Sequence, residues 1–287
     1  DLDVQKFSEN NFISIKMNAN EQYARSLFDQ YNCSGVPHLL FIDKNGEEVD
    51  RIIGYLPPSE YLLRIKDIKN DKYTLNDYLS KFDSGQSNSD LIAGIATKYE
   101  QRGDIENAKK FYSKIIKEYP DSQSDNYKKA TYFIASNAFK TGVDMALQAY
   151  ILSFPDSPFI IDAYFTMINH YSEKNMQNRE LEIYSKMIKQ FPEDAKVLNS
   201  YSWRMTELEV NLEDALEKVR QAIFLTNKEP HIQANILDTE AEVLWKLGRF
   251  NEAIKVIERA IAIDSKNQYF KDQKRKFLNS INTKEAA

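Results

Sequence analysis

The residues of this chain that could carry out redox or proton-transfer chemistry stand close together near its start. The only cysteine, Cys33, is followed by Pro37 and His38. A cysteine thiolate is the nucleophile of disulfide exchange, and histidine changes its charge near neutral pH. However, no second cysteine is present to resolve a mixed disulfide, and free cysteine is among the most buried residue types. We therefore expect Cys33 to be a core residue. We interpret His38 as a tolerated surface residue, with a substrate contact as the alternative.

Other kinds of chemistry find little support in the sequence. The three histidines, His38, His170 and His231, are far apart, and no cluster of His, Cys, Asp and Glu has the spacing of metal ligands. No glycine-rich run precedes a helix with Lys-Ser or Lys-Thr, so no phosphate loop is expected. The net charge of −5 gives no bulk attraction to nucleic acid. The sequence therefore predicts no metal, no cofactor and no nucleic-acid partner.

Length and composition allow two domains with a helical bias. The chain has 287 residues, of which 42% are hydrophobic, enough for a sizeable core. Only eight glycines and eight prolines occur, which favours helices. No apolar run approaches the ~20 residues that a membrane helix needs, so no membrane span is expected.

The candidate reactive residues lie in a segment where strand and helix patterns alternate. Residues 39–43 and 48–53 are predicted strands on either side of Asn45-Gly46, which is the strongest short signal for a β-hairpin. A helix is expected after the hairpin, from Pro57 to about residue 68. Upstream, residues 12–17 alternate as in a strand, and residues 21–31 place apolar side chains on one face of a helix.

This order of elements, with Gly35-Val36-Pro37 before the first hairpin strand and Arg51 in the second, resembles the second half of a thioredoxin domain. The resemblance implies that the Val36–Pro37 peptide bond is cis and faces the redox cysteines. It also implies that Val36 and Pro37 hold the backbone of a substrate as an added strand, with His38 at the same face. No cofactor is implied.

The Cys-x-x-Cys motif of that family is missing from this chain. In the family the motif precedes the strand that matches residues 12–17. We therefore expect the natural protein to continue upstream of Asp1, with the nucleophilic cysteines there. The family's strand order also places residues 12–17 between two strands that would precede Asp1. Without those strands, residues 12–17 would have unpaired N–H and C=O groups along both edges and would not touch the hairpin.

From residue 89 onward the sequence repeats. Pro120, Pro155 and Pro192 each follow an aromatic residue at the end of a helical segment, at spacings of 35 and 37 residues. A period near 34 residues built of two helices is the signature of tetratricopeptide repeats. In the best copy, Ala96 and Ala108 stand where only a small side chain lets the two helices approach closely.

The middle copies depart from this pattern. Ile168 and Glu180 stand where small residues are expected, and the interval between Ser202 and Ala215 is one residue too long. We count about five repeats. A final helix at about residues 269–281 is expected to cap the stack, because it combines many charges with a few apolar residues.

The predicted fold is thus an α/β thioredoxin-like domain, partial in this chain, followed by an all-α superhelix of tetratricopeptide repeats, so that the protein is mainly helical. The expected boundaries are residues 1–83 for the thioredoxin-like domain, 84–88 for a linker, 89–281 for the repeats with their capping helix, and 282–287 for a tail.

The repeat family binds peptides in a concave groove, and its groove positions can be carried over to this chain. They fall on Thr97, Asn169, Glu173, Trp203, Asp238, Glu242 and Trp245. An exposed tryptophan flanked by polar residues would anchor a peptide. The alternative is that Trp203 and Trp245 are packing residues, since most tryptophan surface is buried in proteins.

Two functions compete. The first is a thiol-disulfide oxidoreductase or disulfide isomerase whose repeats bind proteins. The alternative is a non-catalytic scaffold or adaptor with a redox-inactive thioredoxin-like domain. In both cases the expected partners are proteins or peptides, including disulfide-bonded clients. A weaker third idea is that the two domains pack together and the repeats deliver clients. By analogy with similar fusions, a bacterial periplasmic or other extracytoplasmic location is expected, with the cytoplasm as the alternative.

Overall fold

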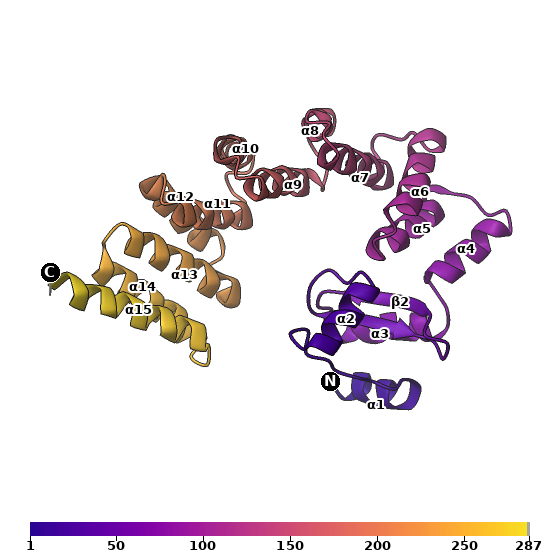
Figure 1. Cartoon of the computed structure of the whole chain (residues 1–287), viewed down its shortest axis with the longest axis horizontal. Helices are drawn as coiled ribbons and strands as arrows, with labels where there is room; N and C mark the ends of the chain where they lie inside the picture. The colour runs from indigo at the N-terminus through magenta and orange to yellow at the C-terminus, as the bar shows by residue number, and fades with distance from the viewer. Residues whose placement is uncertain (286–287) are drawn as a thin grey trace. The chain divides into compact units, whose positions relative to one another are not determined.

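The computed structural model describes residues 1–285 and is mainly helical (Figure 1). Its residues form two compact units, the first being Asp1–Ala163 and the second beginning at Tyr164. Within the described residues, the first unit holds the one β-sheet, and the second unit consists of helices. The predicted fold class, a small α/β part followed by helix pairs, is confirmed.

The sheet of the first unit is an antiparallel hairpin of β1 (His38–Ile42) and β2 (Glu48–Ile53). His38 pairs with Ile53, and the register shifts between Phe41 and Ile42. The turn is held by the Asp43 carboxylate, which accepts from the backbone N–H groups of Asn45 at 2.8 Å and Glu47 at 2.9 Å. The hairpin predicted from the Asn-Gly signal is confirmed.

Three helices surround this hairpin: α1 (Leu2–Asn11), α2 (Gln22–Gln30) and α3 (Pro58–Lys69). Residues from α1, α3 and one face of the hairpin form an apolar cluster around Ile52, Ile65 and Ile68. Side chains alternate across a strand, so His38 and Arg51 lie on the other face. There His38 meets Phe28 of α2, with 6.4 Å between ring centres.

The predicted strand at residues 12–17 is wrong. Phe12 has an extended backbone, with φ −136° and ψ 151°, but the segment joins no sheet. A strand persists only where a neighbour satisfies its N–H and C=O groups. In the described residues β1 and β2 pair with each other, so none is left for this segment. Contrary to expectation, the segment does reach the hairpin through one side chain, since the Phe12 ring lies 5.4 Å from that of Phe41.

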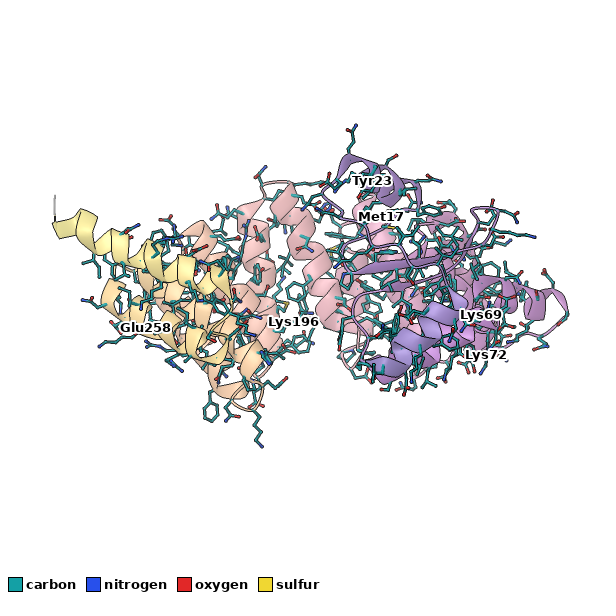
Figure 2. All side chains as sticks on the ribbon, turned by 90° about the horizontal axis from the view of Figure 1, so that it is seen from below. Met17, Tyr23, Lys69, Lys72, Lys196 and Glu258 are labelled. Carbon is teal, nitrogen blue, oxygen red and sulfur yellow. The ribbon has the colours of Figure 1, made fainter. Side chains whose placement is uncertain are left out.

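The rest of the segment between α1 and α2 is open to solvent. Ile13 is 95% exposed and Ile15 is 74% exposed. Met17 and Tyr23 also lie at the surface of the first unit (Figure 2). Four apolar side chains in and just after this segment are thus exposed at the surface of the first unit.

Helix α4 (Leu75–Asp83) packs with the helices that follow it. Thr74 caps its N-terminus by accepting from the Asp77 N–H at 3.1 Å. Leu75, Tyr78 and Phe82 share an apolar cluster with the next two helices. We predicted that residues 75–83 belong to the thioredoxin-like domain. In the structure they pack against the first repeat, because their apolar side chains contact the apolar cluster of that repeat.

The helices from residue 89 onward form consecutive pairs and a final helix (Figure 1). In chain order these are α5 (Ser89–Gln101), α6 (Ile105–Glu118), α7 (Asp125–Lys140), α8 (Ala146–Ser153), α9 (Ile160–Glu173), α10 (Gln177–Gln190), α11 (Ala195–Leu208), α12 (Leu212–Leu225), α13 (Pro230–Lys246), α14 (Phe250–Ile263) and α15 (Gln268–Glu285).

The contacts inside these pairs follow from small side chains at their crossing points. Ala96 and Ala108 are fully buried, which lets α5 and α6 approach closely. In the pair α11–α12 the hydroxyl of Ser202 donates to the backbone carbonyl of Ala215 at 2.9 Å. The extra residue in this pair is accommodated in the turn, where Glu209 and Asn211 adopt φ values of 54° and 50°.

Candidate functional site

The first candidate site is the loop between α2 and β1, residues 31–37, which we call the client loop. Val36 in this loop is 73% exposed. The Val36–Pro37 peptide bond is cis, the isomer that the resemblance implies. The Pro37 carbonyl accepts from the Gly54 N–H at 2.9 Å, which ties the end of the loop to the hairpin. Val36 therefore projects next to β1, whose second edge has no partner strand among the described residues.

His38 is not the surface residue that the sequence suggested. It is partly buried, and both of its ring nitrogens are shielded from solvent without a hydrogen-bond partner in the structure. Burial, together with the nearby Arg51 guanidinium, lowers the pKa of His38. The imidazole is therefore neutral at physiological pH.

Cys33 lies in the client loop and is also partly buried. Its backbone N–H donates to the Phe28 carbonyl at 2.9 Å. Burial raises the pKa of the Cys33 thiol, although Arg51 opposes the effect. A thiol that stays protonated at neutral pH is a poor nucleophile, so this environment fits a core residue.

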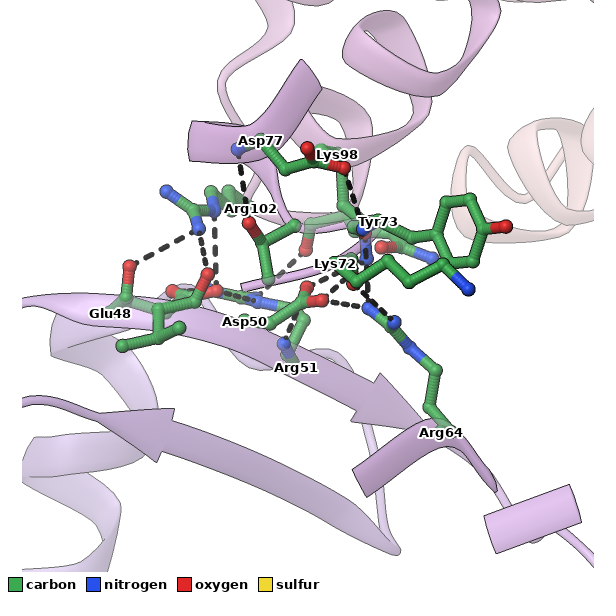
Figure 3. A network of polar contacts seen from close by, with 12 residues as sticks. Glu48, Asp50, Arg51, Arg64, Lys72, Tyr73, Asp77, Lys98 and Arg102 are labelled. Atoms are coloured by element: carbon green, nitrogen blue, oxygen red, sulfur yellow. Dashed lines mark hydrogen bonds and ion pairs between the residues drawn. The ribbon is translucent and has the colours of Figure 1, made fainter. Parts of the chain in front are cut away.

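Next to the client loop lies a buried ionic network that links the hairpin to α5 (Figure 3). Asp50 is fully buried in β2 and accepts from Lys98 Nζ at 2.7 Å and 2.9 Å, and also from Arg64. Burial lowers the pKa of Lys98, and the attraction of Asp50 opposes this shift. Removing one member of such a cluster would leave an unpaired buried charge, which is strongly destabilising.

Arg51 is the hub of the second half of the network and is 3% exposed. Its guanidinium donates to Glu48 at 2.8 Å and 2.5 Å, to the Tyr31 carbonyl at 2.8 Å and to the Gln101 carbonyl at 2.8 Å. Tyr31 ends α2 and Gln101 ends α5. Helix C-termini carry partial negative charge, so one cation stabilises both.

Arg102, which follows α5, also contacts β2. It donates to the backbone carbonyls of Glu48 at 3.2 Å and Val49 at 3.0 Å. These carbonyls belong to the free edge of β2, so the C-terminal end of α5 closes an edge that would otherwise be open to other strands. Sequence reasoning missed this network. The only local signal was the polar alternation in residues 48–53, whose partners lie about 50 residues further along the chain.

The second candidate site consists of the predicted groove residues of α9 and α11 in the second unit. Asn169 and Glu173 are exposed on α9, and Trp203 on α11 is half-buried, its Nε1 donating to Glu207 at 3.0 Å. Arg204 joins the two helices, because it donates to Ser172 at 2.9 Å.

Arg204 also explains how a glutamate can replace a small core residue. Glu180 is 1% exposed at a helix crossing, and Arg204 donates to its two oxygens at 2.5 Å and 3.0 Å. These bonds raise the pKa of Arg204. A buried carboxylate is tolerated at this position because it is fully paired.

The other predicted groove residues are covered. In the last repeat, Asp238, Glu242 and Trp245 lie beneath α15 and bond to it rather than to solvent. Asp238 accepts from Tyr269 at 3.2 Å, Glu242 accepts from Lys276 at 2.7 Å and 2.6 Å, and Trp245 Nε1 donates to Ser280 at 2.8 Å. The groove predicted there is thus filled by α15.

In the first repeat a lysine occupies the groove position. Thr97 accepts from Lys129 Nζ at 3.1 Å, and the same lysine lies 3.3 Å from Glu100. Of the predicted groove residues, Asn169 and Glu173 are exposed and Trp203 is half-buried, and Trp203 bonds to Glu207 of its own helix.

Comparison with known families agrees with this architecture. Residues 2–69 match the model of a thioredoxin-like domain, and residues 95–122 and 234–267 match tetratricopeptide repeats. The chain therefore carries a thioredoxin-like domain followed by tetratricopeptide repeats. A comparison with curated proteins found no match.

Solved structures similar to the chain include tetratricopeptide-like repeats of a Podosopora anserina protein described as a kinesin light chain. That structure is 15% identical, covers 62% of this chain and 96% of its own, and has a TM-score of 0.44. A thermophilic tetratricopeptide repeat protein of Thermus thermophilus is 18% identical, covers 68% of this chain and 99% of its own, and has a TM-score of 0.36. None of the helices in residues 1–285 is long and apolar enough to cross a membrane.

Proposed function

We propose that this chain is the client-binding part of a thiol-disulfide oxidoreductase or disulfide isomerase whose repeats bind proteins. The observation that carries the proposal is the client loop, where Val36 is 73% exposed beside the free edge of β1. An extended client segment can add to such an edge, with main-chain hydrogen bonds giving affinity and side-chain contacts giving specificity. Val36 and Pro37 would contact that segment, and His38, which packs against Phe28 of α2, would support the loop.

The reaction needs two thiols besides those of the client. A thiolate attacks one sulfur of the client disulfide, the S–S bond breaks, and the other client sulfur leaves as a thiolate. A second thiol then attacks the mixed disulfide, so that the client gains two electrons and the protein dithiol is oxidised to a disulfide. Cys33 is partly buried with a raised pKa and serves neither step. Both cysteines are proposed to lie upstream of Asp1, as expected from the sequence.

Reduction of insulin by the natural full-length protein tests the proposal. We expect catalysed reduction, and we expect Val36→Asp to slow it about tenfold or more, because the charge must be desolvated when a client strand covers it. Leu63→Asp is the matched control, since Leu63 is 65% exposed on α3 and lies outside the client loop and the hairpin. Absence of activity in the natural protein, or equal effects of the two variants, would count against the proposal.

A non-catalytic scaffold is the second candidate, and Trp203, which is half-buried and bonds to Glu207 of its own helix, favours it. Tryptophan in a groove is a frequent anchor for peptides, and its truncation typically costs about 2 kcal/mol of binding. We expect Trp203→Ala to lose partners that bind to the repeats. Trp245→Ala is the control, because Trp245 is covered by α15. Retention of all partners by Trp203→Ala in a pull-down would refute the groove at this position.

We also propose a periplasmic or other extracytoplasmic bacterial location. The support is the analogy with similar domain fusions, together with a proposed chemistry that operates on disulfide-bonded clients. Fractionation of cells that express the natural protein tests this proposal, and recovery with cytoplasmic markers would overturn it.

A further inference from the structure

The start of the client loop is fixed to the end of the first repeat helix. Asn32 follows α2 with a φ of 48°, and its side-chain Nδ2 donates to the Arg102 carbonyl at 3.2 Å. Next to it, Gly103 follows α5 with a φ of 73°, and a Cβ placed on Gly103 would lie only 3.2 Å from the Asn32 Cβ. The C-terminal turns of α2 and α5 therefore touch through these two residues.

One buried guanidinium holds these two helix ends together. Arg51 donates to the Tyr31 carbonyl at 2.8 Å and to the Asn32 carbonyl at 3.3 Å on the side of the client loop. It donates to the Gln101 carbonyl at 2.8 Å on the side of α5. The C-terminal ends of two helices repel each other through their dipoles, so a cation between them converts an unfavourable approach into a stable contact.

The far end of the client loop is tied to the same helix through the hairpin. The Gly54 N–H donates to the Pro37 carbonyl at 2.9 Å, and Gly54 directly follows β2. β2 in turn is held by Arg102, which donates to the Glu48 and Val49 carbonyls at 3.2 Å and 3.0 Å. Both ends of the client loop thus depend on groups near the C-terminus of α5.

We propose that α5 of the first repeat positions the client loop, and that Asn32, Arg51 and Arg102 are the positioning residues. In this role the first repeat packs against the thioredoxin-like part. Its contacts fix the loop conformation in which Val36 is exposed. The inference rests on the proposed function only in that Val36 of this loop is taken to contact a client. The positioning itself can be measured without a client or a redox reaction.

The single thiol of the chain reports on this contact. Cys33 follows Asn32 and is partly buried. Its alkylation by N-ethylmaleimide under native conditions, followed by mass spectrometry on the peptide that contains Cys33 so that no other cysteine contributes, measures opening of the client loop. We expect Arg102→Gln to accelerate alkylation about tenfold, since bonds from a charged donor to two partly buried carbonyls are lost. Arg102→Lys keeps a cation that can donate to the same carbonyls and is expected to restore most of the protection.

Two controls separate positioning from general destabilisation. Ile65→Val weakens the apolar cluster of the same unit without touching α5, and should accelerate alkylation less than Arg102→Gln does at equal unfolding free energy. Gly248→Ala alters a turn with nearly the same φ as Gly103 but with no neighbouring atom, and should leave the rate unchanged.

If Arg102→Gln does not fold, Asn32→Ala replaces it, because that variant removes one exposed bond to the Arg102 carbonyl. An alkylation rate within twofold of the unmodified protein in a folded variant would overturn the inference. So would equal acceleration by Arg102→Gln and Ile65→Val, or failure of Arg102→Lys to restore protection. The insulin assay with Val36→Asp tests the proposed function separately, and its failure would leave the alkylation result standing.

Discussion

At the scale of single residues, Gly103, which follows α5, is constrained both by its positive φ and by a close contact with Asn32. Gly103 has a φ of 73° and approaches Asn32, whereas Gly248 has a φ of 75° at the matching turn of the last repeat and meets no atom within 4 Å. An alanine at a positive φ costs roughly 1 kcal/mol in either place. We expect Gly103→Ala to lose about 1 kcal/mol more than Gly248→Ala, because the contact with Asn32 must also move.

Urea unfolding of the two variants, each compared with the unmodified protein, measures this difference. Equal losses would mean that the Asn32 contact yields without cost, and that the approach of the two helix ends is looser than the structure indicates. A larger loss in Gly248→Ala would contradict the expectation outright.

Asp238 is a residue whose charge works against the folded state. Burial beneath α15 raises its pKa from 3.8 to about 6, with Glu242 adding to the shift and the Tyr269 hydroxyl, Gln273 and Lys276 opposing it. A carboxyl with a raised pKa binds its proton more tightly in the folded state. Its contribution to stability is therefore fully present below pH 3.8 and is lost as the pH rises through about 6.

We expect Asp238→Asn to stabilise the second unit at pH 7.5 by about 1–3 kcal/mol, since the amide keeps an acceptor for Tyr269 and carries no charge. At pH 4 the variant should gain little. Thermal unfolding between pH 4 and pH 7.5 measures the effect, and an unchanged dependence on pH in the variant would show that another group is responsible.

At the scale of elements, α4 packs closely on α5 because Gly94 of α5 has no side chain. A Cβ placed on Gly94 would lie 2.7 Å from the Tyr78 ring of α4. Helix propensity alone would make Gly94→Ala stabilising by roughly 0.5–1 kcal/mol, because Gly94 lies inside a helix. Overpacking typically costs 1–3 kcal/mol, so the clash outweighs the propensity.

The expected result is that Gly94→Ala destabilises the first unit by about 1–2 kcal/mol. In a Tyr78→Leu background the same substitution should become neutral or stabilising, because the ring is gone. Urea unfolding of the two single variants and the double variant gives the coupling directly. Additive effects would mean that α4 shifts away from α5 without cost.

The elements themselves were largely predictable, and the contacts that bring them together were not. The hairpin, the helix after Pro57 and the helix pairs follow from local signals, namely turn residues and apolar periodicity. The strand at residues 12–17 failed because a strand depends on non-local partners that its own pattern does not contain. Likewise, Asp50 and Lys98 each look like ordinary surface charges until folding buries them together.

The candidate sites likewise contain some features that the sequence predicted and others that depend on non-local packing. Val36 was predicted from a family resemblance and proves to be exposed, while the burial of His38 depends on α2 packing over it. Trp203 and Trp245 occupy equivalent-looking places in the sequence. They differ because α15 covers only the second. The sequence predicted that this helix caps the stack, but not that Tyr269, Gln273 and Lys276 would bond to the predicted groove residues of the last repeat.

At the scale of the whole molecule, the chain forms two compact units, and we expect them to unfold in separate transitions. Ile65 is fully buried in the first unit, and Met187 is fully buried in the second. Both tryptophans belong to the second unit, so tryptophan fluorescence follows that unit alone, whereas far-UV circular dichroism follows both.

Truncating a buried Ile or Met to Ala costs about 2–5 kcal/mol. We expect Ile65→Ala to lower one of the thermal transitions seen by circular dichroism by roughly 5–10 °C while the fluorescence midpoint stays unchanged. Met187→Ala should instead lower the fluorescence midpoint. If Ile65→Ala lowered the fluorescence midpoint as much as the circular dichroism midpoint, the chain would unfold as one cooperative body, and a disturbance of the thioredoxin-like part would then be felt throughout the repeats.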